Sequence, residues 1–142
     1  MARYPTRTGR SAPLGRSSEA ALADHALGLA EAGQVADAEA LMAQLSEESS
    51  DDPLFPLLLG TLRAKLGDHV GAVVAYDESL ERHVLHGGKA RFEGELRLLR
   101  ARSLILCGRE REAQVDLFLA AASPDANVAR GAQAILTRRD DA

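Results

Sequence analysis

The stretch PLFPLLLGTLRAKLGDHVGAVVAYDESLER, residues 53–82, decides the fold of this chain. Its apolar residues recur at helical spacing on both sides of Gly67, which predicts two amphipathic helices joined by a turn. Asp52 and Pro53 form a helix-start signal, because the carboxylate accepts from free amides and proline suits the first helical position. Gly67 favours the left-handed conformation that ends a helix, and Asp68 can cap the next one. The stretch therefore predicts a helical hairpin.

The same start and stop signals continue outward in both directions. Gly33 and Gly108 can end helical segments as Gly67 does, and Ser123-Pro124 can restart a helix as Asp52-Pro53 does. An Ala- and Leu-rich composition favours helices, and no run of β-branched and aromatic residues indicates a strand. We expect helices over residues 17–31, 35–45, 53–66, 68–84, 89–107, 110–122 and 124–138.

The glycine turns also mark an internal repeat. Gly33 and Gly67 are 34 residues apart, and Gly67 and Gly108 are 41 apart, which is one extra heptad. An alanine follows each glycine by five residues, and a large side chain follows four residues later: Ala38 and Met42, Ala72 and Tyr76, Ala113 and Leu117. The alanine lets two helices approach closely, and the large residue fills the space where they diverge. Each hairpin then leaves apolar surface that only a stacked neighbour can cover.

This pattern resembles the tetratricopeptide repeat family. The middle repeat carries the family's residues at the family's spacing: Leu59-Gly60, Gly67-Asp68, Ala72, Tyr76 and Leu80. The first repeat has His25-Ala26 where the family prefers Leu-Gly, and the third has Ala101 at the small position. Arg63 and Ser79 depart from the family pattern, since they replace a large apolar residue and an alanine.

The resemblance implies an all-α fold of three antiparallel helix hairpins, stacked in a right-handed superhelix with a C-terminal capping helix. The three repeats would span about residues 19–52, 53–88 and 89–122, and the capping helix would span 124–138. Residues 1–18 precede them as a basic arm that we expect to be flexible, and residues 139–142 form a polar tail.

Charge is distributed unevenly along the chain. The net charge is −4, yet residues 1–18 carry Arg3, Arg7, Arg10 and Arg16 without an acid. The remainder is therefore an acidic body of charge −8. Such a body repels phosphate backbones, which argues against nucleic acid as a partner.

No apolar run is long enough for a membrane span, and the N-terminus lacks the apolar segment of a secretory signal. The single cysteine, Cys107, cannot form an internal disulfide, as is usual in a reducing compartment. We expect a cytoplasmic protein that does not bind membranes.

In the tetratricopeptide family, the first helix of each hairpin lines a concave surface through positions i, i+3, i+7 and i+10. Here these positions are Ala20, Ala23, Leu27 and Ala30, then Leu54, Leu57, Thr61 and Ala64, then Glu95, Leu98, Arg102 and Ile105. The second and third of these helices also carry a separate apolar stripe, so each helix has apolar residues on two faces. Either the second face packs on neighbouring hairpins or on the seventh helix, or it forms an open groove.

For an open groove, we expect partner contacts from Leu27, Leu54, Leu57, Thr61, Lys65, Leu98, Arg102 and Ile105. Such a surface suits an amphipathic helix or an extended apolar peptide, with Arg102 and Lys65 orienting an acidic group of the partner.

Two narrower likenesses within the family point in opposite directions. Adaptors that grip the acidic C-termini of heat-shock chaperones carry a clamp of lysines, asparagines and arginine, where this chain has Ala23, Leu27, Leu57 and Thr61. That class is excluded. The size, the acidity and the apolar groove are instead similar to the small tetratricopeptide chaperones of bacterial type III secretion, as is the third repeat from Ala101 to Phe118.

Catalytic and metal-binding patterns are weak. His83 and His86 lie one helical turn apart beside Glu81, but no further ligand cluster follows, so a solvated helix end is the preferred interpretation. His25 is interpreted as a core histidine and Cys107 as a buried structural thiol. Gly87-Gly88-Lys89 lacks the remaining residues of a phosphate-binding loop. We expect no metal, no cofactor and no enzymatic activity.

Two hypotheses for function follow. The first is an adaptor or chaperone that holds a helix or apolar peptide of another protein, and it predicts that Leu57→Glu or Leu98→Glu abolishes binding while helicity survives. The second is a structural protein whose apolar helix faces pair two copies of the chain, with the extra heptad at 84–91 supplying contacts.

Overall fold

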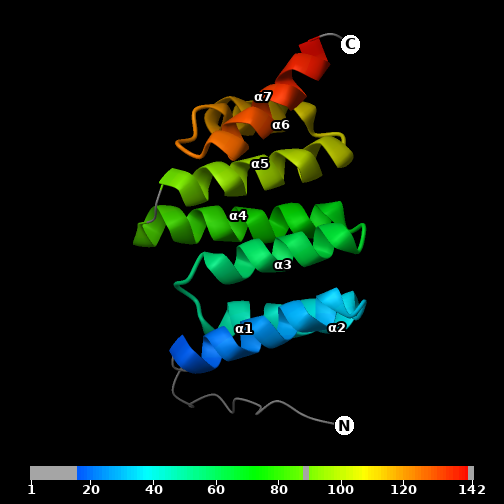
Figure 1. Cartoon of the computed structure of the whole chain (residues 1–142), viewed down its shortest axis with the longest axis vertical. Helices are drawn as coiled ribbons and strands as arrows, with labels where there is room; N and C mark the ends of the chain where they lie inside the picture. The colour runs from blue at the N-terminus through cyan, green and yellow to red at the C-terminus, as the bar shows by residue number, and fades with distance from the viewer. Residues whose placement is uncertain (1–15, 88–89, 141–142) are drawn as a thin grey trace.

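The computed structural model of the chain describes residues 16–87 and 90–140 (Figure 1). These residues form seven α-helices and, within these ranges, no strand. The helices are α1 (Arg16–Glu31), α2 (Val35–Glu48), α3 (Leu54–Lys65), α4 (His69–His86), α5 (Ala90–Leu106), α6 (Glu110–Ala121) and α7 (Ala126–Asp140). The predicted all-α class is confirmed. Most of the predicted basic arm, residues 1–15, lies outside the described residues, as do residues 88–89 and the last two residues of the tail.

The helices lie side by side and succeed one another along the long axis of the molecule (Figure 1). Helix α1 packs on α2, α3 on α4, and α5 on α6, while α2 with α3 and α4 with α5 join these pairs. Helix α7 packs on α6 and also reaches α5. Each pair thus covers the apolar surface of the next, as expected for stacked hairpins.

The three predicted glycine turns have the same geometry. Gly33, Gly67 and Gly108 have φ of 88°, 83° and 80°, which a residue with a Cβ rarely adopts. After each glycine, the next amide donates to a carbonyl five residues back, at 2.8 Å for Gln34, 2.9 Å for Asp68 and 2.8 Å for Arg109. These bonds satisfy carbonyls that the helix end leaves free. The three glycines identified from their spacing in the sequence therefore form the same type of turn.

A small residue and a large residue sixteen positions later meet in the core of each hairpin: Ala26 and Met42, Gly60 and Tyr76, Ala101 and Leu117. All six are buried. A Cβ on Gly60 would lie 2.5 Å from Cε1 of Tyr76, so the rigid ring requires glycine there. In the outer repeats the large residue is Met42 or Leu117, whose flexible side chain leaves room for an alanine at the small position. The outer repeats therefore have alanine in place of glycine where the large residue is not an aromatic ring.

Arg63 and Ser79, which depart from the family pattern, make polar contacts between helices. The Arg63 guanidinium donates to Oε1 of Glu39 on α2 at 3.1 Å and to the carbonyl of Gly71 on α4 at 3.2 Å. Ser79, fully buried, donates to the carbonyl of Pro53 at 2.7 Å, at the start of α3. Both residues donate hydrogen bonds to backbone carbonyls near the starts of neighbouring helices, which the apolar side chains of the family pattern could not do.

A buried carboxylate connects the last hairpin to the centre of the molecule. Asp116 on α6 is fully buried and accepts from Arg97 at 3.0 Å and from Arg100 at 2.8 Å, both on α5. Arg100 also donates to Asp77 on α4 at 2.9 Å. The hydrogen bond to Asp116 raises the pKa of Arg100 above its ordinary value. Three successive helices are thus joined through two acids, Asp77 and Asp116, and two arginines.

Candidate functional site

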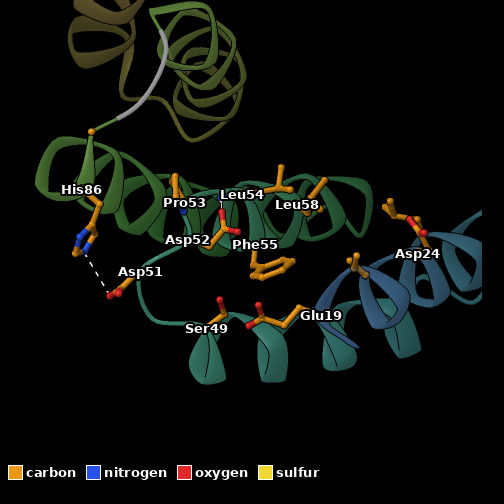
Figure 2. A pocket seen from close by; sticks show the side chains of 14 residues that line it. Glu19, Asp24, Ser49, Asp51, Asp52, Pro53, Leu54, Phe55, Leu58 and His86 are labelled. Carbon is orange, nitrogen blue, oxygen red and sulfur yellow. Dashed lines mark hydrogen bonds and ion pairs between the residues drawn. The ribbon is translucent and has the colours of Figure 1, made fainter. Parts of the chain in front are cut away.

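A hollow of about 730 Å³ opens between α1, the α2–α3 connection, α3 and the end of α4 (Figure 2). Its lining residues are Glu19, Ala20, Ala23, Asp24, Leu27, Ser49, Asp51, Asp52, Pro53, Leu54, Phe55, Leu58, His86 and Gly87. The hollow lies at the end of the hairpins where α3 begins and α4 ends. Its volume is of the size that holds a few large side chains of a partner.

The floor of the hollow is apolar because two first helices present one face each. Ala20, Ala23 and Leu27 recur at i, i+3 and i+7, so they share one side of α1. Leu54 and Leu58 recur at i and i+4 on α3 and face them across the hollow. Leu54 is 43% exposed, so this large apolar side chain is only partly covered by the rest of the protein. This floor is unfilled apolar surface.

The rim of the hollow carries four carboxylates and one histidine. Glu19 and Asp24 come from α1, and Asp51 and Asp52 come from the α2–α3 connection. Asp52 caps α3 by accepting from the amide of Leu54 at 2.9 Å, and Nε2 of His86 lies 3.5 Å from Oδ1 of Asp51. Within the described part of the chain, neither Glu19 nor Asp24 has an ion-pair partner. The rim is therefore acidic.

The rim is held in place by Arg82, a buried residue of α4. Its guanidinium donates to the carbonyls of Ser46 at 2.8 Å, Ser49 at 2.9 Å and Asp52 at 3.1 Å. The bonds to Ser46 and Ser49 satisfy carbonyls at the end of α2, which runs to Glu48, three residues beyond the predicted end near residue 45. The only local partner of Arg82 among the described residues is Glu78, at 2.9 Å one turn earlier, and the carbonyls that it holds lie 30–36 residues away.

The structure separates the residues predicted for the groove into an open and a covered group. Leu27 and Leu54 line the hollow. Leu57 and Leu98 are only 5% and 7% exposed, so the glutamate substitutions proposed from sequence would bury a charge and unfold the chain. Leu57 packs with Tyr76 and other core residues, and Leu98 packs with residues of α7.

The remaining predicted groove residues lie away from the hollow. Thr61 is half-buried and donates to the carbonyl of Leu57 at 3.0 Å, and its hydroxyl lies 3.3 Å from that of Tyr76. Burial raises the pKa of Tyr76. Lys65 and Arg102 are exposed, and Ile105 is half-buried against the core that α7 completes.

The histidines differ from the sequence-based interpretation. His25, expected in the core, is exposed. His83, expected at a solvated helix end, is 7% exposed, stacks on Phe92 with ring centroids 5.5 Å apart, and lies 3.4 Å from Glu93. Residues three apart lie on nearly the same face of a helix, so the two histidines differ in their position along α4: His83 lies where Phe92 of α5 packs on it, and His86 is the last residue of the helix. Among the residues that the structure describes, no three potential ligands gather into a metal site.

Helix length and hydropathy give no candidate membrane span in the parts of the chain that the structure describes. No family model matches the sequence, and no curated protein matches it either.

Solved structures, in contrast, are similar over most of the chain. SycD, the type III secretion translocator chaperone of Yersinia enterocolitica, is 21% identical, with a TM-score of 0.75 over 87% of this chain and 91% of that chain. SycD in complex with a peptide of the translocator YopD is 22% identical, with a TM-score of 0.70 over 88% of this chain and 97% of that chain. PcrH from Pseudomonas aeruginosa is 21% identical, with a TM-score of 0.73 over 88% and 93%. At this identity the likeness establishes the architecture, so the chain has the tetratricopeptide-like fold of these structures.

Proposed function

We propose that this protein is a cytoplasmic chaperone or adaptor that holds an apolar or amphipathic segment of a partner protein. The carrying observation is the likeness to SycD in complex with a translocator peptide, combined with an open apolar hollow in this chain. The partner we propose is a secreted protein with an aggregation-prone segment, as a type III secretion translocator would be. The role is binding, without catalysis or a cofactor.

The physical support for binding is the exposure of apolar surface at the hollow. Leu27, Leu54 and Leu58 offer a floor that water covers when no partner is present, and covering it is favourable. We propose that Thr61, Lys65, Arg102 and Ile105 extend the binding face along α3 and α5. Leu57 and Leu98 would then support this face from beneath rather than contact the partner.

A photo-crosslinking amino acid at Leu54 tests this function in the native host. We expect one predominant crosslinked protein, because Leu54 lies on the proposed binding face, and we expect that protein to lose solubility when the chain is removed. Leu66, at the C-terminal end of α3, serves as the matched control position, because it is a leucine of similar exposure (48%) that does not line the hollow. Equal crosslinking from Leu54 and Leu66 would contradict a binding site in the hollow.

Self-association is the second candidate function, because large apolar side chains are exposed away from the hollow. Val70 and Val74 on α4 and Val115, Phe118 and Leu119 on α6 are 47–67% exposed. SycD is also known in an alternative dimer, with 22% identity, a TM-score of 0.71 and coverage of 88% of this chain and 96% of that chain. Apolar surface of this kind is typical of an interface between copies.

Sedimentation equilibrium of the wild type and of Phe118→Asp tests self-association. A dimer that becomes a monomer in the variant, with unchanged helical circular dichroism, supports pairing through α6. Phe118 is 60% exposed, so the substitution leaves the fold intact. A wild type that is a monomer at all concentrations would exclude this function.

A further inference from the structure

We infer that the hollow selects a partner segment in which an arginine or lysine lies beside an aliphatic side chain. This inference rests on the proposed function, because it specifies the chemistry of the segment that the hollow holds. It differs from the expectation drawn from sequence, in which Lys65 and Arg102 orient an acidic group of the partner.

The charge of the lining carries the inference. Among the residues that the structure describes, every charged residue that lines the hollow is an acid apart from His86, and none is a lysine or an arginine. Of the four carboxylates, Asp52 is engaged in capping α3. Glu19 and Asp24 have no ion-pair partner among the described residues. The ion-pair partner of Asp51 within these residues is His86, and the Asp51 side chain is 80% exposed. Three carboxylates around an apolar floor attract a cation and repel an anion.

The two cations expected to contact the partner lie elsewhere. Lys65 is the last residue of α3, whereas Leu54 is the first, so they are separated by about 16 Å along the helix at 1.5 Å per residue. Arg102 belongs to α5 and lies beside α7, where its guanidinium is 3.7 Å from the position of a Cβ on Gly131. Neither residue neutralises the rim of the hollow.

The apolar floor and the acidic rim together suit a pair of neighbouring side chains, one aliphatic and one cationic. An aliphatic side chain covers Leu27, Leu54 and Leu58, while the methylene stem of an adjacent arginine or lysine lies on the same floor and carries its charge to the rim. Arginine fits best, because its planar guanidinium can pair with a carboxylate through two hydrogen bonds. A purely apolar segment would make the contact with the floor without the ion pair, and an anionic segment would be repelled by the carboxylates of the rim.

Methyl NMR of the full-length chain with a matched peptide series tests the inference. The probes are acetyl-Ala-Leu-Arg-Ala-Ala-Leu-Arg-Ala-amide and the same peptide with either citrulline or glutamate at both arginine positions. Citrulline keeps the shape of arginine and removes its charge. We expect the arginine peptide to shift the methyl signals of Leu27, Leu54 and Leu58, with a Kd about five-fold lower than that of the citrulline peptide and the glutamate peptide weakest.

Charge variants of the chain locate the effect. We expect Glu19→Gln with Asp24→Asn to remove the preference for arginine over citrulline while the citrulline Kd stays unchanged. Asp37→Asn with Glu47→Gln is the matched control, because both acids are exposed on α2 and neither lines the hollow. Salt of about 1 M should also remove the preference in the wild type, because it shortens the screening length to about 3 Å. The salt experiment needs no variant to fold.

The inference is overturned by equal Kd values for arginine and citrulline, by tighter binding of the glutamate peptide, or by methyl shifts outside the hollow only. Failure of the proposed function has a different signature, which is the absence of a Leu54 crosslink in the host. A hollow that lacks the arginine preference but still yields that crosslink keeps the function and rejects the cationic partner.

Discussion

The first helices of the N-terminal and C-terminal hairpins carry the same concave-face pattern but differ in what covers it. On α1 and α3 part of this face remains open: Leu27 and Leu54 line a hollow of about 730 Å³, although Leu57 on α3 is only 5% exposed. On α5, Leu98 of the equivalent face is covered by α7 and is 7% exposed, whereas Arg102 on the same face stays exposed. Periodicity establishes that a helix has a second apolar face, but only the position of other elements decides whether that face meets protein or water.

The largest test of this difference is the pair Leu98→Glu and Leu54→Glu. We expect Leu98→Glu to lower the free energy of unfolding by about 4 kcal/mol or more, because it places a charge between α5 and α7. Leu54→Glu should change it by about 1 kcal/mol or less, because the side chain is 43% exposed. Urea denaturation of both variants measures the difference. Equal losses would mean that the hollow is closed in solution.

The second test asks whether the core beneath the hollow is tightly packed, because a helix with an open face can still have a close-packed core on its other side. Gly60→Ala should destabilise the chain by about 2 kcal/mol, because the new methyl group would meet the buried ring of Tyr76 at 2.5 Å. Gly131→Ala on α7 should be close to neutral, because the methyl group meets the flexible ends of Leu98 at 3.2 Å and of Arg102 at 3.7 Å.

Gly28→Ala is the control for both glycine variants. Among the described residues, no atom beyond the chain neighbours of Gly28 and the backbone of its own helix lies within 4 Å of a Cβ at this position, so the better helix propensity of alanine should stabilise the chain by about 0.5 kcal/mol. Thermal unfolding followed by circular dichroism ranks the three variants. A Gly60→Ala variant as stable as Gly28→Ala would show that the Tyr76 ring has room to move.

Local signals explain why most of the fold was predictable. A glycine that requires positive φ and a cap residue act over a few positions, so the turns at Gly33, Gly67 and Gly108 were found and confirmed. The end of α2 was predicted three residues too early, and there the carbonyl of Ser46 accepts from Arg82, which lies 36 residues later in the sequence. The buried Asp116 depends on arginines 16 and 19 residues away, and no local pattern marks it.

The candidate site was predicted only in part for the same reason. Spacing on the first helices identified Leu27 and Leu54, because residues on one face of a helix follow from the sequence alone. It did not identify the acidic rim, which combines α1 with the α2–α3 connection, or the burial of Leu98 by a helix some thirty residues later. The inward position of His83 likewise depends on where α5 crosses α4. The sequence pattern does not show which helices pack against each other, and that packing decides which residues line the hollow and which are buried.

The smallest expected effect concerns Glu93, at the junction between the open and covered regions. Its carboxylate accepts from Arg97 at 2.8 Å on α5 and lies 3.4 Å from His83 on α4. The hydrogen bond from Arg97 holds the pKa of Glu93 below its ordinary value. A lowered pKa in the folded state stabilises the fold above the unfolded glutamate pKa of about 4.3, and this contribution is lost as the pH falls through the folded pKa.

Glu93→Gln should therefore lower the free energy of unfolding by about 0.5 kcal/mol at pH 7 and by less near pH 3. The effect is small because the Glu93 side chain is 37% exposed, so that water screens its interactions. Urea denaturation of variant and wild type at both pH values measures it, with Glu95→Gln, an exposed acid on the same helix, as the control. A loss at pH 7 that persists unchanged at pH 3 would assign the role of Glu93 to packing rather than charge. The two regions would then be joined at this point without an electrostatic contribution from α5.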